Sequence, residues 1–293
     1  MKSEFECIPC ILRQTIEATR LSVKNENQQR LVINKVLHFL QNANYEVSPP
    51  ELGKYIFDII CETTGNNDPY RELKIKYNKF ALEKYGLFKK LIYLHNDPVL
   101  LAAKLAVSGN LIDFSKKESE HQISRIIENI HKMEFLINDY HLFMEDILNA
   151  KNILYLTDNA GEIVFDKIFI EVLQRFYPER AQKFTVVVRG APIINDATMD
   201  DALLINLDAI ASVIDNGDRA PATVLHNVSK EMKKYYDNAD LIISKGQGNF
   251  ETLHNEEKLI YFMFRIKCPI IAKELNLTES GMVLKRNKTT LSV

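Results

Sequence analysis

The sequence contains no tryptophan and only four cysteines in 293 residues. Four thiols, Cys7, Cys10, Cys61 and Cys268, are too few for the disulfide framework of a small secreted protein and fit the reduced thiols of a cytosolic one. The opening stretch, MKSEFECIPC, has no apolar run after its lysine, so it does not look like a secretory signal. No stretch approaches about 18 consecutive apolar residues, so we expect no membrane span. We therefore expect a cytoplasmic protein without a membrane partner.

An excess of charge of one sign is also missing. The 37 lysines and arginines nearly balance the 39 acidic residues, for a formal net charge of -2. Without a basic surface the sequence gives no support for a nucleic-acid partner. The patterns G-x-G-x-x-G, G-x-x-x-x-G-K-[ST], H-E-x-x-H and G-x-S-x-G are absent as well. Their absence argues against dinucleotide binding, P-loop NTPases and two common classes of hydrolase.

What the sequence does contain, up to about residue 140, is helical periodicity. Three segments repeat apolar residues with the 3.6-residue period of amphipathic helices. Ser48-Pro49-Pro50 predicts the start of the second of these helices, with serine as its cap and proline in its first turn. We expect no strand in this part of the chain. The apolar positions are Val32, Ile33, Val36, Leu37 and Leu40; Leu52, Tyr55, Ile56, Ile59 and Ile60; and Ile123, Ile126, Ile127 and Ile130.

From about residue 150 the pattern changes to short apolar runs separated by helical or loop segments. The runs are Ile153–Leu156, Phe184–Val188, Ala211–Ile214 and Leu241–Ile243. Strands that alternate with helices predict an α/β fold with a mostly parallel sheet and helices on both faces. Such strands are buried on both sides, which explains continuous apolar runs. Leu259–Ile266 and Ile270–Ala272 are compatible with either further strands or helices.

Each of the four runs leads into a polar cluster rich in Asp, Asn and Gly. The clusters contain Thr157-Asp158-Asn159, then Arg189-Gly190 with Asn195-Asp196 shortly after, then Asp215-Asn216-Gly217-Asp218, and finally Ser244-Lys245-Gly246-Gln247-Gly248-Asn249. One such cluster is an ordinary turn. Because the carboxyl ends of parallel strands share one edge of a sheet, four of them predict a common site.

The residue types in these clusters suit a metal and an anionic ligand. Asp158 and Asp196 offer carboxylates and Asn159 an amide oxygen, the hard ligands that Mg²⁺ and Mn²⁺ prefer. The alternative is that Asp158 and Asn159 only cap the following helix. Lys245, among glycines, is a candidate phosphate contact, and its alternative is a solvated surface lysine. Arg189 is a second candidate contact for an anion.

The order of the motifs resembles a known family. TDNAGEIVFD, VVRGAPIINDAT, DNG and SKGQGNFET resemble the metal-dependent damage-control phosphatases, whose family also includes a eukaryotic member described as an acidic-residue methyltransferase. Cys7-Ile8-Pro9-Cys10, Asp68-Pro69-Tyr70 with Lys74 and Asn78, and Gly109-Asn110-Leu111-Ile112-Asp113-Phe114 resemble motifs of its stand-alone prokaryotic branch, which carries a CxxC. The resemblance covers nearly the whole chain, apart from residues 22–50 and 115–150.

The resemblance implies a fold, a cofactor and a reaction. It implies a helical region over residues 1–145 and a Rossmann-like α/β domain over residues 146–293. It also implies a divalent metal (Mn²⁺, Co²⁺, Ni²⁺ or Mg²⁺) that supports hydrolysis of small phosphomonoesters by water. Asp158 and Lys245 are then the expected catalytic residues. The expected metal ligands are Asp158, Asn159 and Asp196, and the expected substrate contacts are Glu162, Lys245, Arg189, Asn110 and Asn216.

Several points stay open at this stage. Asn110 would touch substrate or only end a helix with Gly109, and Asp68 and Asp113 would line the same cleft on weaker grounds. Where the family often has glycine the sequence has Ala222, which argues against phosphate contacts from that loop. A methyltransferase using S-adenosylmethionine and a non-catalytic sugar-phosphate or metal-binding regulator remain as other functions.

The cysteine pair is a separate hypothesis. Cys7 and Cys10, three residues apart, would lie on one face of a helix and supply half of a structural zinc site. Cys61 is a candidate third ligand, but no fourth follows from the sequence. Two small residues buried in helix packing explain the pair equally well.

Overall fold

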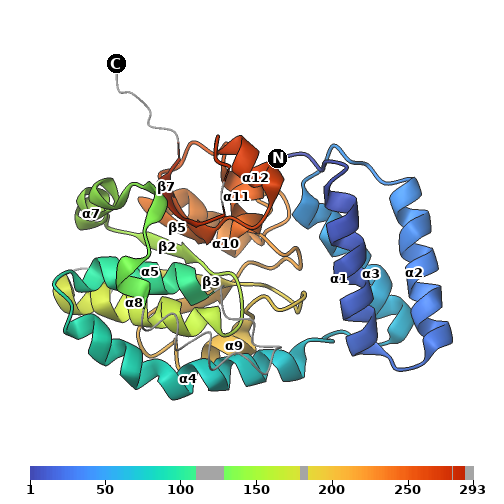
Figure 1. The fold of residues 1–293 in the computed structure, drawn as a ribbon, viewed down its shortest axis with the longest axis horizontal. Helices are drawn as coiled ribbons and strands as arrows, with labels where there is room; N and C mark the ends of the chain where they lie inside the picture. Colours follow the sequence, from blue (N-terminus) through green and yellow to red (C-terminus); the bar gives the residue numbers. More distant parts are fainter. Residues whose placement is uncertain (110–128, 179–183, 279, 288–293) are drawn as a thin grey trace.

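The computed structural model describes residues 1–109, 129–178, 184–278 and 280–287 (Figure 1). A sheet of seven strands lies at its centre. The helices are α1 (Cys7–Ser22), α2 (Glu26–Gln41), α3 (Pro49–Thr64), α4 (Arg71–Tyr93), α5 (Pro98–Ser108), α7 (Tyr140–Asn149), α8 (Glu162–Phe176), α9 (Met199–Leu204), α10 (Lys230–Asn238), α11 (Gln247–Leu253) and α12 (Pro269–Glu274). The strands are β1 (Phe135–Asn138), β2 (Ile153–Leu156), β3 (Phe184–Val188), β4 (Ser212–Asp215), β5 (Leu241–Lys245), β6 (Ile260–Arg265) and β7 (Met282–Arg286).

The sheet has the order β1-β7-β6-β5-β2-β3-β4, and all neighbouring strands are parallel except β6 and β7. This confirms the predicted α/β fold with a mostly parallel sheet. The predicted runs 153–156 and 184–188 coincide with β2 and β3, and the other two fall within a residue or two of β4 and β5. Of the two ambiguous runs, the first is β6 and the second lies in α12.

Helices cover both faces of the sheet because alternate strand residues enter different cores. In β2, Ile153 and Tyr155 belong to the core formed with α4, α5 and α8, whereas Leu154 and Leu156 belong to the core formed with α10, α11 and α12. This is the two-residue period of a strand buried on both sides. Figure 1 shows α4, α5 and α8 below the sheet and α11 and α12 above it.

The prediction that no strand occurs before about residue 140 is wrong. β1 lies there and pairs with β7, which was also missed. Both strands are short, and the outer residues Leu136 and Asn138 of β1 are exposed. Four or five such residues give no readable periodicity. α4 and α5 also pack on α8, so residues before 145 help to build the sheet's core. The division at residue 145 stays a prediction, and the expected helix through Ile123–Ile127 lies outside the described residues.

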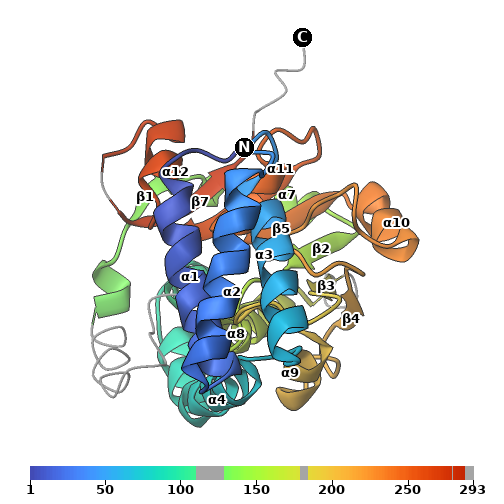
Figure 2. The same cartoon turned by 90° about the vertical axis from the view of Figure 1, so that its right-hand side faces the viewer.

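The first three helices form a bundle beside the α/β part (Figure 1), and the three helices face the viewer in Figure 2. Val32, Val36, Ile56 and Ile60 meet in its core, as the predicted periodicity requires. α3 starts as expected: the Ser48 side chain takes part in a capping box with Glu51 and prolines fill the first turn. Within the described residues, no helix of this fold has the length and apolarity needed to cross a bilayer.

One arginine in the loop after β4 holds this bundle against the α/β part. Arg219 donates from Nη1 to Asp58 Oδ1 of α3 at 2.9 Å and from Nη2 to the Asn67 carbonyl at 2.9 Å. Its Nε donates to the Pro192 carbonyl at 2.9 Å, and its guanidinium lies 5.3 Å from the centre of the Phe57 ring. Three segments that are distant in the sequence are therefore joined by one side chain.

We expect Arg219→Ala to lower the free energy of unfolding by roughly 2–3 kcal/mol, because a half-buried carboxylate and two carbonyls lose a charged donor. Urea denaturation followed by circular dichroism measures the effect. Arg13→Ala is the matched control, because Arg13 is an exposed arginine of the same bundle, and it should change stability by less than about 0.5 kcal/mol. Equal stability of the two variants would contradict the role of Arg219.

Candidate active site

The strand register brings the predicted polar clusters to one edge of the sheet. Leu156 at the end of β2 pairs with Val187 of β3 on one side and with Ser244 of β5 on the other. Val188 of β3 pairs with Asp215 of β4. From β2 the chain continues to β3 and β4 in one direction and returns to β5 and β6 in the other. Such a reversal of strand order forms a crevice at the carboxyl ends, where ligands bind in open α/β sheets.

The three expected metal ligands lie together in this crevice. Asn159 and Asp196 form an isolated antiparallel bridge between the loop after β2 and the loop after β3. Two backbone hydrogen bonds fix the loops on either side: Ala197 N donates to the Asp158 carbonyl at 2.8 Å, and Ala160 N donates to the Asn195 carbonyl at 2.9 Å. The local backbone thus sets the spacing of the candidate ligands.

Gly246, directly after β5, closes the crevice on its other side. It is a glycine with φ of 81° and ψ of 157°, a conformation open almost only to glycine. A Cβ at this position would lie 2.3 Å from Asp158 Cγ. The Asp158 carboxylate therefore fills the space that a side chain at 246 would need.

Side-chain hydrogen bonds orient the acidic groups. Asn159 Nδ2 donates to Asp158 Oδ2 at 2.6 Å and to Glu162 Oε2 at 3.1 Å, which turns the amide nitrogen toward these carboxylates. Arg189 Nε donates to Asp196 Oδ2 at 2.7 Å, and both side chains are almost fully buried. Of the expected ligand atoms, Asn159 Oδ1 is not engaged by any of these bonds.

The site holds more negative than positive charge. Four buried carboxyl groups, those of Asp158, Glu162, Asp166 and Asp196, face the two buried cations of Arg189 and Lys245. Burial raises the pKa of Asp158 well above its usual range, and the carboxylates of Glu162 and Asp196 raise it further. Burial also raises the pKa of Asp196, against the opposing effect of Arg189. A divalent cation at this place would relieve both effects.

The donor set fits a hard cation better than zinc. Two carboxylates and one amide oxygen leave positions for water and substrate, as Mg²⁺ and Mn²⁺ prefer. Across the described ranges, no group of three or more His, Cys, Asp or Glu side chains is arranged so that it could hold a metal ion. The candidate site would therefore need the Asn159 amide in addition to its two carboxylates. Cys7 is buried, with its pKa raised mainly by that burial, whereas Cys10 on the same helix is exposed. The zinc hypothesis for these cysteines stays a prediction without a third ligand.

Lys245 is fully buried, which excludes the solvated surface alternative. Its Nζ donates to Asp166 Oδ1 at 2.6 Å, to Glu162 Oε1 at 2.7 Å and to the Ala106 carbonyl at 3.0 Å. Burial by itself would lower the pKa of Lys245, but the carboxylates of Asp166 and Glu162 outweigh it and raise the pKa. All three ammonium protons are used inside the protein, so the phosphate contact expected for Lys245 stays a prediction.

Asp166 is a site residue that the sequence reasoning missed. It accepts from Lys245 and, at 2.7 Å, from the Tyr155 hydroxyl. The available signal was its position one helical turn after Glu162, where Asp166 and Lys167 are the two charged residues in a run from Ile163 to Ile170 that is otherwise apolar. Because Asp166 and Glu162 share the same ammonium, α8 contributes a pair of carboxylates to the site.

We expect the Asp166 carboxyl to titrate near pH 6. Burial raises its pKa from 3.8 to about 6, with Glu162 adding to the rise and Lys245 opposing it. The native pKa lies above the unfolded value, so folding takes up a proton, and the stability gained from this carboxyl is lost as the pH rises through that interval. In carbon-13 spectra of the aspartate-labelled protein, a carboxyl resonance should titrate near pH 6 and vanish in Asp166→Asn. A midpoint near pH 4 would contradict the burial argument.

Two of the expected substrate contacts carry buried donors without a partner among the described residues. These are Arg189 Nη2, at the end of β3, and Asn216 Nδ2, after β4. Asn216 Oδ1 accepts from Gly190 N at 2.9 Å and from Asp218 N at 3.0 Å, so its carbonyl side is used to shape the loops. A buried donor without a partner calls for an explanation such as a missing water or ion.

The remaining expectations fall around the site. Asn110 and Asp113 lie outside the described residues. Gly109 is described, and an added Cβ there would lie 3.2 Å from Glu162 Cγ, so the end of α5 reaches the site. Asp68 contacts Lys74 at 3.1 Å rather than the candidate ligands. The loop with Ala222 turns inward, because the next residue donates its N–H to Asn249 Oδ1.

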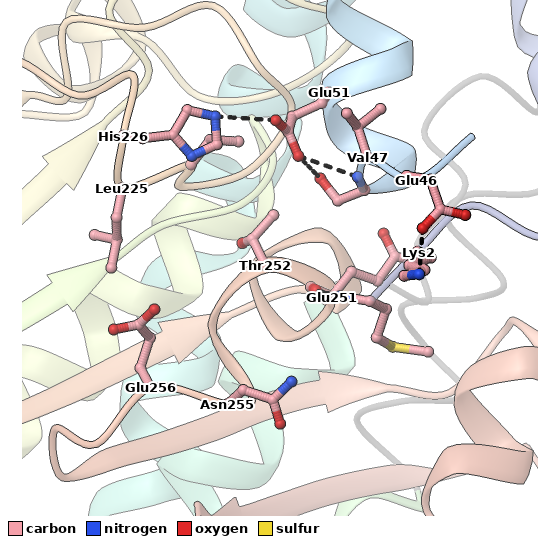
Figure 3. Close-up of a pocket in the computed structure, with 13 residues that line it drawn as sticks. Lys2, Glu46, Val47, Glu51, Leu225, His226, Glu251, Thr252, Asn255 and Glu256 are labelled. Carbon is pink, nitrogen blue, oxygen red and sulfur yellow. Dashed lines mark hydrogen bonds and ion pairs between the residues drawn. The ribbon is translucent and has the colours of Figure 1, made fainter. Parts of the chain in front are cut away.

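A separate hollow of about 480 Å³ lies near the far end of α11 (Figure 3). None of the expected site residues lines it. His226 Nε2 lies 3.0 Å from Glu51 Oε1 there, and Lys2 contacts Glu46. Glu251 and Glu256 add further acidic groups (Figure 3). This acidic surface does not suit a phosphate.

Comparison with known proteins decides the family. A family model described as the damage-control phosphatase ARMT1-like domain matches residues 4–283. The chain belongs to the damage-control phosphatase family. The family resemblance of the motifs is thereby confirmed.

Two archaeal proteins, one of them also known as a crystal structure, show how closely this damage-control phosphatase family member follows its relatives. A damage-control phosphatase of Pyrococcus horikoshii is 34% identical, and the match covers 99% of this chain and 100% of that protein. A damage-control phosphatase of Archaeoglobus fulgidus is 32% identical over 97% and 99% of the two chains. The crystal structure of a DUF89 family protein from P. horikoshii covers 98% of this chain with a TM-score of 0.91 at 34% identity.

Proposed function

We propose that this protein is a metal-dependent phosphatase that hydrolyses small phosphorylated metabolites, such as sugar phosphates or damaged phosphomonoesters. The observation that carries the proposal is the excess of buried carboxylates at the switch point of the sheet, beside two buried cations. This combination suits one hard cation and one phosphate. The names of the relatives support the same reaction class.

Asp158, Asp196 and Asn159 Oδ1 would hold the metal. A bound divalent ion supplies Lewis acidity toward the phosphoryl group and lowers the pKa of water that attacks it. We assign hydrolysis to water rather than to Asp158 as a nucleophile, because Asn159-Ala160 follows where aspartyl-nucleophile phosphatases carry D-x-D-x-T. Asp158 would instead serve as a ligand, oriented by the hydrogen bond from Asn159 and seated in the space left by the missing side chain of Gly246.

Arg189 is the residue we assign to the phosphate. Its Nε is fixed on Asp196, which orients the planar guanidinium, and its Nη2 has no partner in the described part of the chain. A guanidinium that is already held in position can stabilise negative charge on the oxygens of the transferred phosphoryl group, because it does not have to move during the reaction. Lys245 contacts Glu162 rather than the proposed phosphate position. Its positive charge would offset the negative charge of the carboxylates around the metal.

Asp158→Asn tests the proposal. Loss of one ligand charge should reduce Mn²⁺-dependent hydrolysis of p-nitrophenyl phosphate by roughly 10²- to 10⁴-fold, because a Lewis-acid metal contributes several kcal/mol and about 1.4 kcal/mol is tenfold. Asp237→Asn, an exposed aspartate of α10, is the matched control and should retain wild-type turnover. EDTA should abolish turnover of both the wild type and the control.

The other functions give different results in the same assays. A methyltransferase would bind S-adenosylmethionine in calorimetry and release no phosphate. A non-catalytic regulator would be stabilised by Mn²⁺ and sugar phosphates without turnover. Wild-type turnover in Asp158→Asn would show that Asp158 is not a metal ligand.

A further inference from the structure

Asn78 on α4 is a buried side chain that the proposed mechanism does not use. It is fully buried and comes from the helical part of the chain. Its Oδ1 accepts from Gly161 N at 2.7 Å, and its Nδ2 donates to Asp201 Oδ1 at 2.8 Å. One amide group therefore bridges two segments of the α/β part.

The two segments are those that carry the proposed metal ligands. Gly161 follows Asn159 by two residues and stands at the start of α8. Asp201 accepts from Thr198 N at 2.9 Å and from Thr198 Oγ1 at 2.8 Å, and so completes the capping box of α9, whose N-cap Thr198 lies two residues after Asp196. The bridge across Asn78 thus runs from one ligand loop to the other, alongside the backbone contacts between them.

The bridge requires one group that accepts and donates at two separated atoms. Gly161 offers a donor and Asp201 an acceptor, so the bridging group must accept on one side and donate on the other, as asparagine does. Lys74, one turn earlier on α4, lies 3.6 Å from Asp201 Oδ2 and places a buried positive charge on the same carboxylate. Removal of the Asn78 amide would leave two buried polar groups without partners.

We propose that Asn78 is a positioning residue that fixes the spacing between the Asn159 loop and the Asp196 loop, and thereby sets the affinity of the metal site. The inference rests on the proposed function, because only a bound metal depends on that spacing. It assigns the helical part of the chain a role in the site that does not require contact with substrate.

The test is a calorimetric titration of Mn²⁺ into the full chain after removal of metal with EDTA. In Asn78→Ala the Kd for Mn²⁺ should rise about 10- to 100-fold, the usual effect of removing a partner that orients metal ligands. Phe88→Leu is the matched control. Phe88 packs edge-on against Phe165 with ring centres 5.2 Å apart, so this variant weakens the same α4–α8 contact without touching the ligand loops. Its Kd should stay within about twofold of wild type.

Asn78→Ser provides a second variant in case the alanine protein folds poorly. A hydroxyl is too short to reach both partners, so the same rise in Kd is expected. The inference would be overturned if either Asn78 variant kept the wild-type Kd for Mn²⁺ while its melting temperature fell as in Phe88→Leu. Asn78 would then contribute only to the stability of the fold. Failure of the wild-type chain to bind Mn²⁺ would instead overturn the metal site itself.

Discussion

Replacing Gly246 with alanine is expected to abolish metal binding and phosphatase activity while most of the fold remains. The new Cβ would lie 2.3 Å from Asp158 Cγ and 2.4 Å from its Oδ2, distances that no packing tolerates. The backbone at this position is also strained for any side chain, which costs about 1–3 kcal/mol. The Asp158 carboxylate must therefore move away, and the site loses the whole ligand, whereas Asp158→Asn removes only its charge.

Gly86→Ala is the matched control for this glycine. Gly86 lies in the interior of α4, and an added Cβ there meets nothing within 4 Å. Alanine at an open helical position is expected to raise the free energy of unfolding by about 0.4–1 kcal/mol. Calorimetric titration with Mn²⁺ and the p-nitrophenyl phosphate assay compare the two variants. Wild-type Mn²⁺ affinity in Gly246→Ala would show that Asp158 is not a ligand.

Lys245→Met is expected to lower the free energy of unfolding by about 3–5 kcal/mol, because it leaves the buried carboxylates of Asp166 and Glu162 without their shared cation. The loss should be larger at pH 8 than at pH 6, because the Asp166 carboxyl, whose pKa is about 6, is ionised at the higher pH. Chemical denaturation at pH 6 and pH 8 measures it. Activity should fall as well, since Glu162 also holds Asn159.

A double replacement separates the loss of charge balance from the loss of packing. In Lys245→Met with Asp166→Asn, one unpaired carboxylate is removed, so part of the stability should return, and the interaction energy should reach 0.5–3 kcal/mol as for residues in contact. Lys234→Met, at an exposed position of α10, controls for the change of residue type. Unchanged stability of the single Lys245 variant would mean that Lys245 does not balance buried negative charge in the native protein.

The sequence was sufficient to predict the sheet edge and the polar loops that meet there. β2, β3 and β5 are buried on both faces, so their residues form apolar runs whose ends are marked by polar turns. The same reasoning failed for β1, because its four residues are too few to show a readable alternation. For Lys245 the sequence placed the residue at the site but not its partners, because only the fold shows that α8 places two carboxylates against it.

Contacts between distant parts of the chain could not be predicted from the sequence for a different reason. Asn78, Arg219 and Asp166 act through partners between 11 and 161 positions away, as in Arg219 with Asp58 and Asp166 with Tyr155. Helical periodicity predicts that such residues lie on a buried or exposed face, but not which loop meets that face. Asn78 belonged to a recognised motif, yet its two partners became evident only from the fold.

The order of strands in the sheet has a consequence for how the protein is made. β2 is central, with β3 on one side and β5 on the other. During synthesis β3 becomes available soon after β2, but β5 emerges only after residues 157–240 have left the ribosome. Until then one edge of an apolar central strand has no partner, which is the kind of edge that pairs with other chains. The nascent protein should therefore be most prone to aggregation, and most dependent on chaperones, in the interval before β5 is added.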